Sequence, residues 1–182
     1  MTLPLPPNSE RMATNRFFAR YRHLAETNQR LDAADTIDAV LEVLRTQARS
    51  IAEADGVAVI RRDGDYVDYV GEDAIAPLWT GQRFPIRRCI SGLAILEHAP
   101  ILIPDIVNDA RVPLSAYLAT FVQSMAVFPL GAPAPFAALG LYWREARPME
   151  QDVQALVTLL AQSANAAFER IAVRSERAGM AA

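Results

Sequence analysis

The sequence contains a single cysteine, Cys89, so no disulfide can form within the chain. A lone thiol is typical of proteins from a reducing compartment. The first residues, MTLPLPPNSERM, lack the apolar run behind a basic segment that marks a secretory signal peptide. The apolar stretches are strand-sized, well short of the roughly 20 residues of a membrane-spanning helix. We therefore expect a soluble, cytoplasmic protein with no membrane partner.

Lysine is absent, and all 18 basic residues are arginines scattered along the chain. A nucleic-acid-binding surface gathers its positive charges, so with a net charge of −3 we expect no nucleic acid as a direct partner. Histidine is scarce as well. His23 and His98 stand far apart, whereas a metal site needs three or four ligands, so we expect no metal.

What the sequence does have is the composition of one globular domain, with 52% hydrophobic residues in a chain of 182. Three segments carry apolar residues at helical spacing. The first spans 10–34, after a proline-rich tail over 1–9. The second begins at Asp35, a residue suited to cap a helix N-terminus. The third follows Pro148, and 176–182 is expected to be a loose tail.

Between the second and third helices the apolar spacing changes from 3.6 to 2, which indicates strands. Asp63-Gly64 is a strong turn signal between two of them. Short helices are expected over 90–98 and 112–121. The expected strands span 56–60, 66–70, 82–86, 101–106, 124–130 and 136–143. This order of elements predicts an α/β (α+β) protein with a mostly antiparallel sheet.

The middle of the chain resembles the GAF domain family. Ser91-Gly92 opens a short helix, and APILIPDIVNDARVP (99–113) follows it. In that segment Asp105, Asp109 and Arg111 stand where the family has an Asp and then an Asp-x-Arg turn.

The C-terminal half extends the resemblance. SMAVFPLGAPAPFAALGLYW (124–143) resembles the paired strands of the family, and the last helix resembles its closing helix. Ala137 departs from the pattern, because the family usually has Gly there. The resemblance covers about 35–172. Within the family, the residue pattern most resembles that of sensor domains in bacterial signalling proteins such as sensor histidine kinases.

The resemblance implies a central antiparallel sheet of about six strands, with helices packed on one face and a pocket on the other. It also implies long N- and C-terminal helices, which often pair between subunits. The domain with its C-terminal helix then spans 35–175, and 10–34 is a flanking helix. Members of the family bind cyclic nucleotides, bilins, haem or small metabolites, or nothing detectable, so the cofactor is left unknown.

Seven residues are candidates for lining such a pocket. An apolar cavity with one hydroxyl for orientation would suit the aromatic members of this set, although aromatic residues at helical spacing are also ordinary core. The candidates are Trp79, Cys89, Ser91, Asp105, Tyr117, Phe121 and Met125.

The polar candidates each have a structural alternative. Asp105 either orients the polar edge of a ligand or pins its turn through hydrogen bonds to the backbone, as Asp109 and Arg111 also can. Cys89 is either a reactive thiol for a tetrapyrrole or a redox signal, or a small buried residue, and we favour the second. The pair Arg87-Arg88 either meets a carboxylate or phosphate or stays solvated.

The apolar stripes of the terminal helices extend, over 17–31 and 168–174, beyond the expected sheet. They would leave Phe17, Tyr21, Leu24 and Ile171 with nothing in the domain to pack on. A homodimer through a parallel or antiparallel helix bundle is the expected solution. The alternative is that the first helix folds back on its own domain.

These features favour a non-catalytic sensory domain in bacterial signal transduction, which relays a small molecule or partner signal to a signalling kinase or output domain. One alternative is a photosensor or redox sensor that holds a bilin or haem. Another is a free methionine sulfoxide reductase, which needs a nucleophilic and a resolving cysteine. One thiol cannot serve as both, so we expect no enzyme and assign no catalytic residue.

Overall fold

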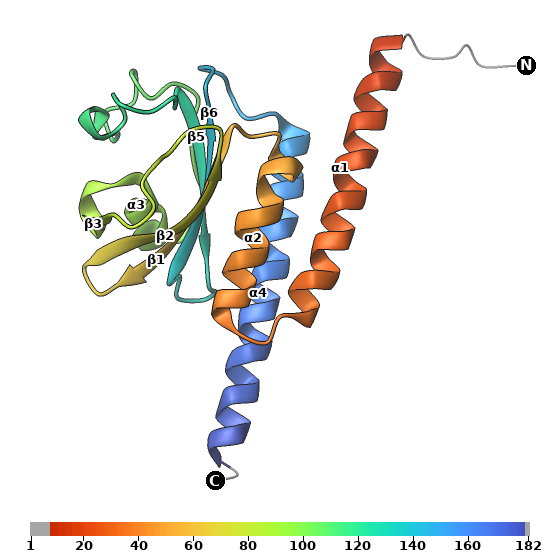
Figure 1. Ribbon diagram of the computed structural model, residues 1–182, viewed down its shortest axis with the longest axis vertical. Coiled ribbons are helices and arrows are strands. Elements are labelled where there is room, and N and C mark those ends of the chain that lie inside the picture. Colours follow the sequence, from red (N-terminus) through yellow and green to blue (C-terminus); the bar gives the residue numbers. More distant parts are fainter. Residues whose placement is uncertain (1–7, 181–182) are drawn as a thin grey trace, which may run out of the picture.

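Six strands form one antiparallel sheet in the order β3-β2-β1-β6-β5-β4 (Figure 1). The computed structural model describes residues 8–180. The strands are β1 (Gly56–Asp63), β2 (Tyr66–Ala74), β3 (Arg83–Pro85), β4 (Ile101–Ile103), β5 (Ser124–Leu130) and β6 (Ala137–Trp143). Each pair of neighbouring strands runs antiparallel.

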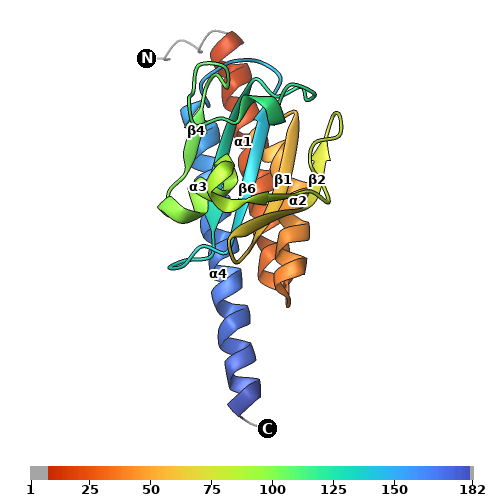
Figure 2. The ribbon, with the colours of Figure 1, turned by 90° about the vertical axis from the view of Figure 1, so that its left-hand side faces the viewer.

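The helices divide between the two faces of this sheet. Figure 1 shows α1 (Asn8–Ala33), α2 (Ile37–Ala52) and α4 (Gln151–Met180) on one side, with α1 outermost. On the other side, seen facing the viewer in Figure 2, lie α3 (Ile90–Glu97) and the loops. Two 3-10 turns, η1 (Ile86–Arg88) and η2 (Leu114–Ala116), flank α3 in the sequence. The predicted fold class, an α+β protein with helices on one face of an antiparallel sheet, is confirmed.

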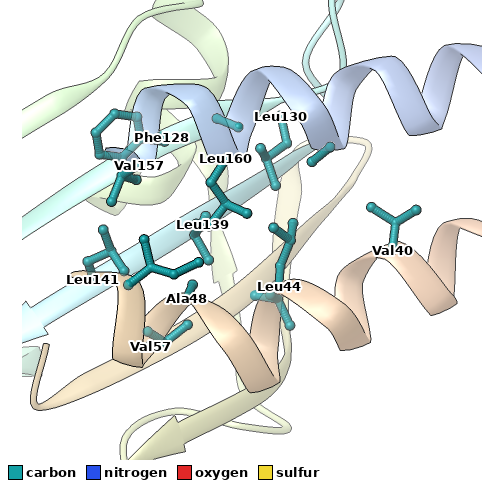
Figure 3. Packing of buried hydrophobic residues seen from close by; sticks show 14 of the residues in the cluster. Val40, Leu44, Ala48, Val57, Phe128, Leu130, Leu139, Leu141, Val157 and Leu160 are labelled. Carbon is teal, nitrogen blue, oxygen red and sulfur yellow. The ribbon is translucent and has the colours of Figure 1, made fainter. Parts of the chain in front are cut away.

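Side chains of the central strands alternate between two hydrophobic cores, as a period of two requires. On the helix face, Leu139 and Leu141 of β6 meet Leu44 of α2 and Leu160 of α4 (Figure 3). On the opposite face, Tyr142 of β6 belongs to a second core with α3 and the loops. Because both faces are covered, every residue of β6 is buried.

Several element boundaries differ from those expected. The 112–121 segment forms only the turn η2 and not a longer helix; Tyr117 is buried against the second core, whereas Leu118 is 76% exposed. Thr36, and not Asp35, caps α2, since its hydroxyl accepts the N–H of Ala39. Helix α4 continues through Met180 into the expected tail. Residues 1–7 and 181–182 of the two expected tails lie outside the described residues.

Helix α1 folds back on its own domain, which corrects the expectation that its apolar stripe lies free. Leu24 and Ile171, predicted to lack a partner in the domain, are buried in the core shared by α1, α2 and α4. Phe17 packs against the edge of that core, and only Tyr21 of the four is largely exposed. The aromatic stripe is therefore split between an inward and an outward face of α1.

Among residues 8–180, no helix combines the length and apolar character needed to cross a membrane. The same residues contain no group of three or more His, Cys, Asp and Glu side chains arranged to hold a metal ion.

Candidate functional site

A half-open cavity of about 220 Å³ lies on the face of the sheet opposite the three long helices. Strands β2 and β3, the loop between them, η1 and η2 supply its walls, so residues far apart in the sequence converge there. Its surface is largely apolar. The lining residues are Tyr69, Trp79, Phe84, Pro85, Arg88, Cys89, Pro113, Ala116 and Tyr117.

Trp79 is the centre of the aromatic wall. Its ring lies 5.5 Å from that of Tyr69, 5.0 Å from that of Tyr117 and 5.4 Å from that of Tyr142, each in an edge-to-face arrangement. Phe84 adds a further edge-to-face contact, 5.5 Å from Tyr69. Such pairs are favourable beyond the area they bury, and they hold the rings at fixed angles. These contacts hold the aromatic part of the cavity wall in a fixed arrangement.

The carboxylate of Glu72 fixes the backbone that carries Trp79. It accepts the N–H groups of Leu78, Trp79 and Thr80 at 2.9–3.0 Å. Burial by itself raises the pKa of Glu72, but these hydrogen bonds outweigh burial and hold the pKa below its ordinary value. On the other side of the ring, Trp79 Nε1 donates to the carbonyl oxygen of Ala116 at 3.2 Å. Trp79 is thus anchored at both its backbone and its side chain.

Behind the cavity wall lies a chain of buried polar groups. The hydroxyls of Tyr69 and Ser91 lie 3.2 Å apart, and the Ser91 hydroxyl donates to Cys89 Sγ at 3.4 Å. Burial raises the pKa of the Cys89 thiol and of the Tyr69 phenol. Both groups are therefore protonated and neutral at pH 7. A thiol of this kind is a poor nucleophile, because the reactive form is the thiolate.

Gly92 is required for the position of Cys89. A Cβ atom at residue 92 would lie 1.8 Å from the carbonyl oxygen of Ile86, so only glycine lets α3 approach η1 this closely. That approach sets Arg88 and Cys89 at the junction between η1 and α3, where both line the cavity.

The structure brings some of the seven candidates together. Trp79, Cys89 and Tyr117 line the cavity. Ser91 stands behind Cys89, and Met125 Sδ accepts a hydrogen bond from the Tyr117 hydroxyl at 3.7 Å, so both belong to the layer beneath the wall. That these five residues serve a ligand stays a prediction.

The other two candidates lie outside the residues that line the cavity. Phe121 is half-buried and packs close to Gly56. Asp105 accepts hydrogen bonds from the N–H of Val107 and the side-chain amide of Asn108, so its carboxylate is used within its own turn.

The neighbouring Asp-x-Arg turn is also closed on itself. Asp109 accepts the N–H of Arg111 at 3.0 Å and pairs with its guanidinium at 2.6 Å. The hydrogen bond from Arg111 lowers the pKa of Asp109. These contacts agree with the structural alternative for Asp109 and Arg111, because they stabilise the loop that leads from β4 to η2.

Sequence reasoning missed six of the lining residues: Tyr69, Phe84, Pro85, Arg88, Pro113 and Ala116. Tyr69 carried a usable signal, since it alternates with outward-facing residues along β2. Arg88 was weighed only as part of a cationic pair. The contacts among the loops could not be read from spacing, because they depend on the way in which the chain crosses the sheet.

No histidine lines the cavity. His98 is exposed at the C-terminal end of α3 in the left-handed backbone conformation, and His23 lies on α1, on the opposite side of the sheet. Neither can supply an axial haem ligand to this cavity.

The sequence itself matches no protein-family model and no curated protein. Solved structures do match the fold. The GAF domain of a phosphoenolpyruvate-protein phosphotransferase from Coxiella burnetii is similar with a TM-score of 0.74 at 14% identity, over 88% of this chain and 98% of that chain. The GAF domain of a two-component sensor histidine kinase from Bacillus halodurans has a TM-score of 0.64 at 13% identity, over 78% and 99%.

An enzyme shares the architecture too. Free methionine-R-sulfoxide reductase from Neisseria meningitidis, solved in complex with its substrate, has a TM-score of 0.72 at 13% identity, over 95% of this chain and 98% of that chain. Proteins of different activity thus share this architecture. At sequence identities this low, the similarity shows the fold alone. The fold of this chain is therefore that of the GAF domain, as the resemblance predicted.

Proposed function

We propose that this chain is a non-catalytic regulatory domain of bacterial signal transduction, which takes a small molecule into the aromatic cavity and relays its presence to the terminal helices. The observation that carries the proposal is an arrangement on two faces of one sheet. A preformed apolar cavity lies on one face, and the helices that lead to both ends of the described chain cover the other. Ligand sites of this kind are concave, mostly apolar and largely preformed.

Strand β6 links the two faces. Tyr142 contacts Trp79 on the cavity side, and its neighbour Trp143 points to the helix side. There Trp143 Nε1 donates to the carbonyl oxygen of Glu53, the residue at the end of α2, at 3.0 Å. A ligand that shifts Trp79 thereby acts through Tyr142 on the strand that holds this bond.

Glu53 in turn holds α1. Its carboxylate pairs with Arg16 at 2.5 Å and lies 3.8 Å from Arg20. Arg20 also pairs with Asp152 near the start of α4, at 2.5 Å. One contiguous set of contacts therefore runs from the cavity to α1 and α4. Such a route carries a signal when the element at its end has two arrangements of similar free energy.

The buried side of α1 carries polar atoms as well as an apolar stripe. Arg20 Nε, His23 Nε2 and Asn28 Oδ1 are buried without a hydrogen-bond partner. Each buried polar atom left unpaired destabilises the contact by about 1–3 kcal/mol. A helix held in this way is easier to shift than one held by an apolar stripe alone.

We further propose that two copies associate through the outer face of α1 and α4. Phe18 and Tyr21 of α1 and Leu159 of α4 are exposed there, beside a groove between the two helices of about 370 Å³. Aromatic residues in a patch of this kind favour burial against a partner. A parallel pair of such faces would carry a change in α1 across the dimer to an attached output domain or kinase.

The alternatives fit the cavity less well. A cavity of 150 Å³ already holds benzene, so about 220 Å³ encloses one ring with a substituent and would leave most of a four-ring bilin outside. Sulfoxide reductase chemistry needs a reactive thiolate and a resolving thiol, whereas Cys89 is buried, neutral and the single cysteine.

A ligand search with a blocked control tests the sensory proposal. The wild type and Ala116→Leu, which fills the cavity, are screened for thermal stabilisation by a library of metabolites. We expect compounds that raise the Tm of the wild type and leave that of Ala116→Leu unchanged, because binding to the folded state shifts the melting equilibrium. If every stabilising compound acts equally on both proteins, or if none is found, the cavity is not a ligand site.

Light scattering on the purified chain tests the dimer. The wild type is expected to be a dimer at micromolar concentration, and Tyr21→Glu is expected to be a folded monomer. Leu118→Glu is the matched control, because Leu118 is exposed outside the α1/α4 face and its substitution should leave the dimer intact. A monomeric wild type would remove the dimer from the proposal.

A further inference from the structure

We propose that the molecule taken into the aromatic cavity is a small aromatic acid, namely one flat ring bearing a carboxylate that pairs with Arg88. This inference rests on the proposed function, since it names the class of ligand for the same cavity. Size, wall chemistry and charge each restrict the ligand, and together they leave this class.

The volume limits the part of a ligand that the cavity can enclose. About 220 Å³ lies between the 150 Å³ of a cavity that holds benzene and the roughly 300–1,000 Å³ of sites for drug-sized molecules. A single six-membered ring with one or two small substituents fits. A nucleotide, with base, sugar and phosphate, does not.

The walls favour a flat ring. Tyr69, Trp79, Phe84 and Tyr117 all line the cavity, and Trp79 meets each of the two tyrosines edge to face. A further aromatic ring can extend this arrangement by stacking on a face or pointing an edge at one. Pro85 and Pro113 complete the walls with rigid apolar surface.

Arg88 sets the charge of the ligand. It is the one charged residue of the lining, and it forms no ion pair with any acidic side chain among residues 8–180. Eleven other arginines in those residues do form ion pairs, and Arg88 is the arginine that lines the cavity with its charge left for a ligand. A guanidinium matches a carboxylate with two parallel N–H···O bonds.

No negatively charged side chain lines the cavity, so none would repel an anion. Burial raises the pKa of Cys89 and of Tyr117, which keeps both side chains neutral at pH 7. The N-terminus of α3 opens at Cys89, so the positive end of that helix faces the same junction as Arg88. An aromatic box can also hold a methylated ammonium group. Here Arg88 would repel that cation, and no lining carboxylate would compensate it.

Four probe molecules separate these features. Benzoate carries ring and charge, benzamide keeps the ring without the charge, cyclohexanecarboxylate keeps the charge without the aromatic ring, and benzylammonium reverses the charge. Binding is followed by NMR on the indole N–H signal of Trp79. The chain has two tryptophans, so Trp143→Phe assigns the signal.

The protein variants are Arg88→Gln, the matched control Arg87→Gln and the blocked variant Ala116→Leu. Arg87 is exposed like Arg88 but does not line the cavity.

We expect benzoate to shift the Trp79 signal saturably and to bind about tenfold more weakly to Arg88→Gln, with less than about a twofold change in Arg87→Gln. Benzamide should bind about tenfold more weakly than benzoate and should be insensitive to Arg88→Gln. Cyclohexanecarboxylate should bind about fivefold more weakly than benzoate. Ala116→Leu should abolish the shift.

The inference is overturned if Arg88→Gln and Arg87→Gln weaken benzoate equally, or if benzylammonium or benzamide binds as tightly as benzoate. In the latter case, loss of binding in Ala116→Leu would still support the sensory function with a different ligand class. If none of the four probes shifts the Trp79 signal, the aromatic acid is excluded. The metabolite screen then decides whether the sensory function fails with it.

Discussion

The two faces of the sheet are built from the same strands but packed in different ways. On the helix face, aliphatic side chains such as Leu139, Leu141 and Leu160 interdigitate between β6, α2 and α4 (Figure 3). On the opposite face, aromatic rings meet edge to face and leave a cavity of about 220 Å³. The comparison teaches that one sheet can carry a closely packed core on one face and a core that leaves a cavity on the other.

The difference follows from the side chains themselves. Aliphatic side chains have several rotamers and fill an interior to a density like that of organic crystals. Rings held by edge contacts and by hydrogen bonds, as Trp79 is held by Glu72 and Ala116, cannot collapse into the space between them. The cavity is therefore a consequence of rigid walls, and substitutions on the two faces should have different effects.

The largest contrast in stability is expected between a substitution that shortens a side chain on the helix face and one that enlarges a side chain on the cavity face. Leu160→Ala should destabilise the fold by about 3–4 kcal/mol, because Leu160 is fully buried and its removal leaves a cavity. Ala116→Leu should change stability by less than about 1 kcal/mol, because space for its side chain already exists. Urea denaturation measures both, and equal losses would show that the two faces are packed alike.

Close packing does occur on the cavity face, at Gly92. Gly92→Ala should destabilise the fold by about 2–3 kcal/mol, because the added Cβ meets the carbonyl oxygen of Ile86. Gly179→Ala is the matched control, since nothing lies within 4 Å of a Cβ there and the helix gains a better helix former. If thermal melts give the same Tm for both variants, α3 does not need its close approach to η1.

A smaller effect is expected from Glu72→Gln, which weakens the bonds that hold Trp79. The substitution removes the negative charge from three N–H···O contacts and should destabilise the protein by about 1–2 kcal/mol at pH 7. It should also shift the Trp79 indole signal. Glu176→Gln, at an exposed position of α4, should do neither.

The effect of Glu72 should depend on pH. Because the folded state lowers the pKa of Glu72 below its ordinary value of 4.5, its carboxylate contributes stability that is fully present above that value. The contribution is lost as the pH falls through the lower pKa of the folded state. The difference in unfolding free energy between the wild type and Glu72→Gln should therefore shrink below about pH 4. A difference that stays constant down to pH 3 would mean that the charge of Glu72 is not what holds the loop.

Much of the architecture could be predicted from the sequence, because it depends on local patterns. The Asp63-Gly64 turn is present with Gly64 at φ 58°, and β5 spans the predicted 124–130. The amphipathic stripes of α2 and α4 predicted which residues cover the sheet. In each case a period of 2 or 3.6, or a turn residue with positive φ, is a physical requirement that the sequence must meet locally.

The candidate site could be predicted from the sequence only in part, because it is assembled from contacts between loops. Trp79, Cys89 and Tyr117 were recognised from residue type, and the structure places them around one cavity. The role of Glu72 depends on a loop returning to within 3.0 Å of its carboxylate, and no spacing rule predicts that. The burial of Leu24 likewise depends on which way α1 turns after Ala33.

The most direct test of the account is the hydrogen–deuterium exchange of α1 with and without benzoate at a concentration that saturates the Trp79 signal. The account predicts that the exchange of α1 amides between Arg16 and Leu31 changes on binding, because the cavity is linked to Glu53 through β6 and Glu53 holds Arg16. Saturated binding with unchanged exchange throughout α1 would contradict it, since the two faces of the sheet would then act independently.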